Sequence, residues 1–275
     1  RKVSAASRGA ALNQSNVMDY HSKQFGAFVF TATLSKLLLN TTRRLIYPFA
    51  PEFSRGLGVE LTTITSVIAV NQATGLLGPF CAGFADRFGF RLFMLASMVM
   101  MIVGTFAVGI IPFFAMLVCC FILSGLAKVI FDASLQAYLG SLVPITQRGK
   151  IIGITELSWA ASTLAGIPAA GLIIRHFSWQ TPFLVISGLT LACFLTLLLI
   201  MPRTGPPVPS NQSAGQSSPS KRANWAMVMK NQRVRAMLAF VFLVSMANDN
   251  LFVVYGVWLE ESFNLSLVAI GMSTI

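Results

Sequence analysis

The sequence has few charged residues and few of the side chains that carry enzyme chemistry. Of its 275 residues, 11% are charged, nine are Asp or Glu and two are His, whereas 55% are hydrophobic. Because soluble domains contain about 25% charged residues, this chain lacks the polar side chains needed to cover a water-exposed surface. It also shows no paired acids, His cluster or activated nucleophile of the kind that an enzyme needs. The composition predicts a polytopic membrane protein and not an enzyme.

Cysteine is also scarce, and its positions exclude two common uses. The four cysteines lie inside apolar runs and not in spaced pairs within loops, at Cys81, Cys119, Cys120 and Cys193. This placement argues against a disulfide framework and against a zinc site, so we expect packing residues. No phosphate-binding loop or nucleotide motif is present, and we expect neither a cofactor nor a metal.

Long apolar runs are abundant. A helix needs about 20 apolar residues to cross the hydrocarbon core, whereas a strand of a membrane barrel would alternate over about 10 residues. We predict an all-α polytopic bundle with seven spans and an eighth that begins near residue 266. The seven spans are expected near residues 26–50, 61–83, 92–112, 114–138, 152–174, 179–201 and 236–258.

The distribution of Lys and Arg predicts the orientation of these spans, because cytoplasmic loops hold the excess of positive charge. With a cytoplasmic N-terminus, only Arg55 and Arg175 fall outside. The net charge of +11 is then mostly a matter of topology, and no basic domain suited to nucleic acid is present. We expect a multi-pass protein of the inner (plasma) membrane. The bases placed in the cytoplasm are Arg1, Lys2, Arg8, Lys23, Arg87, Arg91, Arg148, Lys150, Arg203, Lys221, Arg222, Lys230, Arg233 and Arg235.

The order of polar and apolar segments predicts four parts. A polar leader (1–25) without the apolar core of a signal peptide precedes a six-helix bundle (26–201). A cytoplasmic linker rich in Pro and Ser (202–235) leads into the start of a second bundle (236–275). Because the chain begins with Arg1 and stops inside an apolar run, we expect it to be part of a longer protein.

The loop between the second and third runs is small, charged and bracketed by glycines. Gly83 permits close approach of two helices, and Gly89 permits a turn with positive φ. Asp86 can cap the following helix, and Arg87 and Arg91 can reach a phosphate headgroup or a carboxylate. The alternative is an ordinary basic loop on the cytoplasmic side.

Six runs, a long linker, further runs and this loop together resemble the major facilitator superfamily. Its signature at this place is a glycine, two variable or small residues, Asp, a base, any residue, a glycine and further bases. The five loop residues named above match it, whereas Phe90 stands where the family usually has another base. The resemblance implies a fold of twelve helices in two halves. It also implies that Asp86, Arg87 and Arg91 act as gate residues, with Asp132 as an acidic partner in a charge relay.

Ionisable residues inside the apolar runs are the candidates for substrate and proton binding. Placing a charge near the centre of the bilayer costs at least about 2.5 kcal/mol on insertion scales, so such residues are usually retained for function. Seven residues meet this description: Lys36, Arg43, Arg44, Lys128, Asp132, Glu156 and Asp249.

On the first run, Lys36, Asn40, Arg43 or Arg44, and Tyr47 are three or four residues apart and share one helix face. A polar face in an apolar helix predicts a water-filled cavity, and the resemblance implies that the first, fourth and seventh helices line it. The alternative for Arg43 and Arg44 is that their side chains extend to the outer interface. Lys36 could extend inward in the same way.

On the fourth run, Ser124, Lys128, Asp132 and Gln136 repeat every four residues. Lys128 and Asp132 can pair within the helix, which lowers the cost of placing both in the membrane. The resemblance places Lys128 where many family members carry an arginine implicated in proton coupling; a lysine loses its proton more easily. A purely structural ion pair is the alternative.

The fifth run holds Glu156, a substrate or proton candidate that could instead be solvated or paired with Lys150 or Arg148. The segment 166–171 differs from the family's glycine-proline-glycine motif because Ile167 separates Gly from Pro. We expect a kinked packing face of small residues there.

The seventh run presents a polar and aromatic face around one acid, Asp249. This acid is a candidate proton carrier or cation ligand, because a carboxyl group inside a membrane can change its protonation state during a transport cycle. Packing through a hydrogen bond to Asn248 or Asn250 is the alternative.

These observations favour a monomeric secondary active transporter that moves a small solute, with protons as the expected driving ion. The bases of the first and fourth runs hint at an anionic solute. A non-transporting membrane receptor with the same fold is the second hypothesis.

Overall fold

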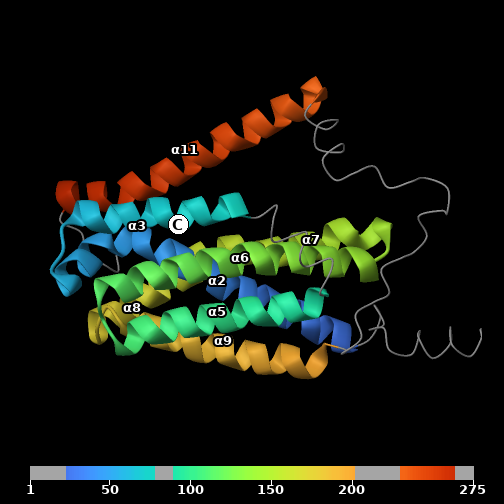
Figure 1. Ribbon diagram of the computed structural model, residues 1–275, viewed down its shortest axis with the longest axis horizontal. Helices are drawn as coiled ribbons and strands as arrows, with labels where there is room; N and C mark the ends of the chain where they lie inside the picture. The colour runs from blue at the N-terminus through green and yellow to red at the C-terminus, as the bar shows by residue number, and fades with distance from the viewer. Residues whose placement is uncertain (1–22, 78–88, 202–229, 264–275) are drawn as a thin grey trace, which may run out of the picture.

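The computed structural model describes residues 23–77, 89–201 and 230–263, and these ranges contain helices and no strand (Figure 1). The prediction of an all-α bundle is confirmed. The elements are α2 (Lys23–Leu57), α3 (Leu61–Ala73), the 3₁₀ turn η1 (Thr74–Leu77), α5 (Phe90–Ile110), α6 (Phe114–Leu142), α7 (Ile145–Ala161), the π-helical turn η2 (Ser162–Gly166), α8 (Ile167–His176), α9 (Thr181–Ile200) and α11 (Gln232–Phe263).

Four helical segments are long and apolar enough to cross a membrane, within the part of the chain that the structure describes. They are α5, α6, α9 and the continuous segment Ile145–His176 that joins α7, η2 and α8. They lie where four of the spans were predicted. The helix α2 is longer than any of them, but it carries Lys36, Asn40, Arg43 and Arg44 in its middle. The spans predicted at 26–50, 61–83 and 236–258 stay predictions.

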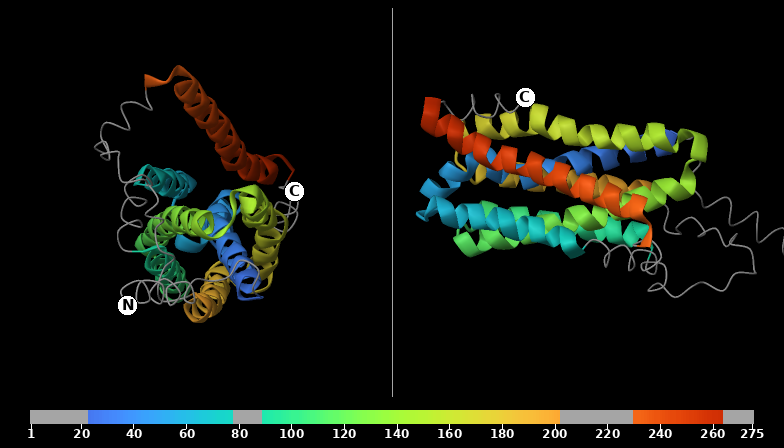
Figure 2. Two further views of the ribbon diagram at one scale, coloured as in Figure 1. Left: turned by 90° about the vertical axis from the view of Figure 1, so that its right-hand side faces the viewer. Right: turned by 90° about the horizontal axis from the view of Figure 1, so that it is seen from above.

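The helix α2 lies at the centre of the bundle. It contacts α3, α6, α7, α8 and α9, while α5 packs between α6 and α9 (Figure 2). The helix α11 crosses on the outside and contacts α2. The middle of α2 is surrounded by these helices, which explains how it keeps charged residues there: neighbouring helices supply their partners.

Aromatic side chains close the bundle at the end where α2 terminates. The Phe53 ring lies 5.8 Å from the rings of both Trp179 and Phe183, and Phe183 lies 6.5 Å from Phe121 in an edge-to-face arrangement. These centroid distances are typical of favourable aromatic pairs. The cluster joins α2 to α6 and α9, and thereby sets the position of α2 along the bundle.

The cysteines are distributed partly as expected. Cys120 and Cys193 are buried among packed helices, whereas Cys119 is exposed and Cys81 lies outside the described residues. The buried thiols behave as small apolar groups.

The turn before α5 has the backbone geometry that the sequence predicts. Gly89 adopts φ of 94°, a conformation that other residues rarely adopt. Arg91 then donates from Nη2 to the carbonyl oxygen of Leu198 at 2.9 Å, which ties the start of α5 to the end of α9. Gly83, Asp86 and Arg87 lie outside the described residues.

The fifth predicted span contains a π-helical turn and packs through a small residue, as expected of its packing face. The π turn η2 ends at Gly166, two residues before Pro168, and Gly166 faces Thr41 of α2 so closely that an added Cβ would overlap the threonine side chain. Local π geometry is a recognised cause of helix kinks. Here the π turn brings Gly166 into contact with α2.

Replacing Gly166 with valine is therefore expected to destabilise the bundle by about 1–3 kcal/mol, the usual cost of overpacking a well-packed contact. The matched control is Gly153→Val on α7, because nothing lies within 4 Å of a Cβ at Gly153. Thermal unfolding of both variants in detergent measures the difference. Equal stability of the two variants would show that the contact with Thr41 accommodates the larger side chain without loss of stability.

Candidate functional site

A polar cavity of about 120 Å³ lies inside the bundle, between α2, α3, α6 and α7. The predicted polar face of α2 contributes four of its lining residues, so this face does point into a cavity. The cavity is lined by Asn40, Arg43, Arg44, Tyr47, Gln72, Lys128 and Trp159.

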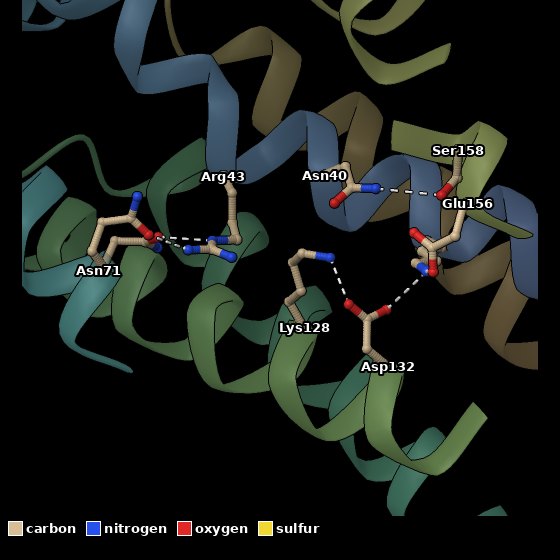
Figure 3. A network of polar contacts seen from close by, with 9 residues as sticks. Asn40, Arg43, Asn71, Lys128, Asp132, Glu156 and Ser158 are labelled. Carbon is tan, nitrogen blue, oxygen red and sulfur yellow. Dashed lines mark hydrogen bonds and ion pairs between the residues drawn. The ribbon is translucent and has the colours of Figure 1, made fainter. Parts of the chain in front are cut away.

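Arg43 is held in one orientation by two neighbouring amides of α3. Its Nε donates to Oδ1 of Asn71 at 2.9 Å, and its Nη2 donates to Oε1 of Gln72 at 2.6 Å (Figure 3). Asn71 in turn donates to the carbonyl oxygen of Phe121 at 2.6 Å, and Gln72 donates to the Tyr47 hydroxyl at 3.2 Å. The guanidinium is therefore anchored through α3 to α6.

Sequence reasoning missed Asn71 and Gln72. The available signal was two adjacent amides inside an otherwise apolar run, a position where an unpaired polar group is costly. Their function depends on the helix that packs against them, and the sequence of α3 does not reveal that neighbour.

Arg44 is held on the other side of the cavity by the kinked span. Its guanidinium carbon lies 4.1 Å from the centre of the Trp159 ring, and its Nη1 donates to Oγ1 of Thr163 in η2. An arginine over a tryptophan face forms a favourable cation–π contact. The π turn thus places the Thr163 hydroxyl where it accepts a hydrogen bond from Arg44. Trp159, which the sequence did not single out, is part of the cavity wall.

A network of two lysines and two acids lies beside the cavity. Lys36 is almost fully buried and donates to Oε1 of Glu156, and its Nζ also lies 3.7 Å from Oδ1 of Asp132. Lys128 donates to Oδ2 of Asp132 at 2.6 Å, one helical turn away (Figure 3). The network joins α2, α6 and α7, and its four charges sum to zero.

This network gives two of the predicted acids a partner, Lys36, that the sequence did not indicate. Glu156 pairs with Lys36 and not with Lys150 or Arg148, because α7 packs against α2. Asp132 contacts the two lysines, whereas Arg91 binds α9 at the end of the bundle. The predicted pairing of Lys128 with Asp132 is confirmed.

A hydrogen bond links the cavity wall to α7, the helix that carries Glu156. Asn40, on the cavity wall, donates to the Ser158 hydroxyl at 3.4 Å, two residues along α7 from Glu156. The structure therefore brings Arg43, Arg44 and Lys128 to one cavity, with Asp132 and Glu156 next to it. The side chain of Asp249 lies outside the described residues.

Membrane-length helices around a polar cavity, with an ion network between helices at its side, are characteristic of membrane proteins that carry solutes. A family model described as Major Facilitator Superfamily matches residues 32–275. The chain belongs to this family, and it is part of an integral membrane protein. The matched family and the relatives described next are transporters, not enzymes.

Relatives of known sequence support the same assignment. The chain is 28% identical over 239 residues to the MFS-type transporter YceJ of Bacillus subtilis, covering 86% of this chain and 60% of that protein. It is 28% identical over 196 residues to the multidrug resistance protein MdtG of Serratia proteamaculans, covering 66% of this chain and 45% of that protein. The chain thus spans less than two thirds of the length of either relative.

Solved structures show the same fold. A bacterial homologue of the human lysosomal transporter Spinster, in an inward-facing and unoccupied conformation, superposes with a TM-score of 0.70 at 14% identity. The match covers 92% of this chain and 59% of that one.

Proposed function

We propose that the full-length protein is a secondary active transporter that moves a small solute by alternating access and is driven by the proton gradient. The ion network formed by Lys36, Lys128, Asp132 and Glu156, next to the polar cavity, carries this proposal. Relatives named as multidrug resistance proteins and efflux pumps support a small organic solute as cargo.

The network is suited to coupling because its charges are balanced while both acids are ionised. Protonation of either acid leaves two ammonium groups facing one carboxylate, which is costly in a poorly solvated setting. Asp132 contacts lysines on two helices, so its protonation weakens the link between α2 and α6. A proton can then bias the bundle between two arrangements, which is the requirement for coupling.

Further features complete the proposal. The gate is formed by the loop residues Gly83, Asp86, Arg87, Gly89 and Arg91 together with Asp132, and Asp249 is a second proton or substrate residue. The protein is monomeric, lies in the inner membrane and has its N-terminus in the cytoplasm.

The division of the chain also belongs to this proposal. The leader (1–25) and the linker (202–235) lie on the cytoplasmic side. The six-helix half (26–201) meets a second bundle that begins in 236–275.

The test uses full-length protein in proteoliposomes that contain a trapped pH-sensitive dye. We expect labelled organic solutes to accumulate when an inward or outward pH gradient is imposed, and solute addition to move protons. Protein-free vesicles and a protonophore are the controls. Solute movement that does not depend on the pH gradient would contradict proton coupling. No movement of any solute by correctly folded protein would favour a receptor.

A further inference from the structure

The cavity wall is unusually rich in positive charge. Three of its seven lining residues are the bases Arg43, Arg44 and Lys128, and two are the aromatic residues Tyr47 and Trp159. The other two are the amides Asn40 and Gln72, so no carboxylate is among these seven lining residues. Such a wall repels cations and attracts anions.

Arg43 contributes charge that its described partners do not neutralise. Both of its hydrogen bonds go to neutral amide oxygens, and no carboxylate within the described ranges forms an ion pair with it. A guanidinium has five N–H donors, and the two bonds to α3 leave its Nη1 edge uncommitted. A partly buried guanidinium that retains both its charge and its spare donors is a strong site for an oxyanion.

The amides also position Arg43 before any ligand arrives. Asn71 is itself held by the backbone of α6, and Gln72 by Tyr47, so the guanidinium plane is set by contacts on two helices. Preorganised donors lose little freedom on binding, which favours affinity. The same contacts give the buried Asn71 and the half-buried Gln72 their hydrogen-bond partners.

Lys128 adds another positive group to the cavity wall. It donates to Asp132 at 2.6 Å, and Asp132 belongs to the neighbouring network and not to the cavity lining. The aromatic residues complete the pocket: Trp159, which carries Arg44 over its ring, and Tyr47 offer flat apolar surface beside the charged groups.

We infer that this cavity binds organic oxyanions, with the anionic head at the Nη1 edge of Arg43 and near Lys128, and a flat apolar body against the aromatic wall. This inference rests on the proposed transport function, because it names the class of solute carried. It also gives Asn71 and Gln72 a role as positioning residues.

Three probes of one shape and different charge test the inference: benzoate, benzylammonium and benzyl alcohol. Calorimetric titration of the full-length protein in lipid nanodiscs is expected to show binding of benzoate and much weaker binding of the other two. Phenyl phosphate, added as a fourth probe, distinguishes a carboxylate from a phosphate head. Preference for benzylammonium, or no binding of either anion, would overturn the inference.

Variants at Arg43 connect the binding to the geometry. Arg43→Gln is expected to weaken benzoate binding about tenfold or more, because a charge-assisted hydrogen bond is lost, and Arg43→Lys is expected to restore part of it. Arg55→Gln is the matched control, since Arg55 is an exposed arginine of the same helix that pairs with Glu52. Equal loss in Arg43→Gln and Arg55→Gln would place the anion elsewhere.

Transport measurements separate this inference from the function on which it rests. Gradient-driven movement of benzylammonium but not of benzoate would leave a proton-driven transporter with the opposite solute class. Benzoate binding that depends on Arg43, in a protein that moves no solute, would contradict transport and leave the oxyanion site standing.

Discussion

Asp132→Asn is expected to abolish the accumulation of solute driven by a pH gradient, down to the level of protein-free vesicles. Asp132 lies between Lys128 at 2.6 Å and Lys36 at 3.7 Å, so it is the acid through which α2 and α6 share charge. Asparagine has nearly the same shape but cannot ionise, so the network remains permanently in its protonated charge state. The measurement is uptake into proteoliposomes with an imposed gradient.

Exchange of solute across the membrane without a gradient is expected to persist in this variant. Exchange requires the cavity and the conformational change, but not the release of a proton. The matched control is Glu52→Gln, because Glu52 lies near the end of α2 and pairs with the exposed Arg55. Normal gradient-driven accumulation by Asp132→Asn would remove this acid from the coupling mechanism. Loss of exchange and accumulation together would indicate a structural role.

Glu156→Leu is expected to destabilise the protein by about 3 kcal/mol, the low end of the cost of leaving a buried charge without its partner. The loss leaves the Lys36 ammonium, whose side chain is 3% exposed, with Asp132 at 3.7 Å as its remaining described ion-pair partner. Lys36→Met is expected to cost less. The Glu156 side chain is 48% exposed, and Asp132 retains Lys128. Thermal unfolding in detergent measures both.

The double variant, Lys36→Met with Glu156→Leu, is expected to recover much of the lost stability, because no uncompensated charge remains at that contact. Glu52→Leu, which breaks an exposed pair, is the control and is expected to cost less than about 1 kcal/mol. If both single variants lose the same stability and their effects add in the double variant, the two side chains are not coupled.

Local sequence patterns predicted the helices well. Apolar runs of about 20 residues marked α5, α6 and α9 because a membrane span must be long enough to cross the bilayer and must satisfy its own backbone. The glycine at position 89 indicated a positive φ in the turn, and the spacing of four residues predicted the pairing of Lys128 with Asp132. Each of these properties depends on residues within one or two helical turns.

The contacts between helices were less predictable. The resemblance implied a charge relay of Asp132 with Arg87 or Arg91, and nearby bases were one alternative for Glu156, but the lysine that contacts both acids is Lys36. Lys36 is 120 residues before Glu156, and no local pattern indicates which face of α7 turns toward α2.

The sequence by itself determined the class of protein, the positions of four of its spans and the set of charged residues that need partners inside the membrane. Only the tertiary structure decided which partner each residue has: Arg43 binds the amides of α3, and Lys36 contacts the acids of α6 and α7. The physical reason is that a buried charge requires a partner but does not specify which one. That choice follows from how the helices pack.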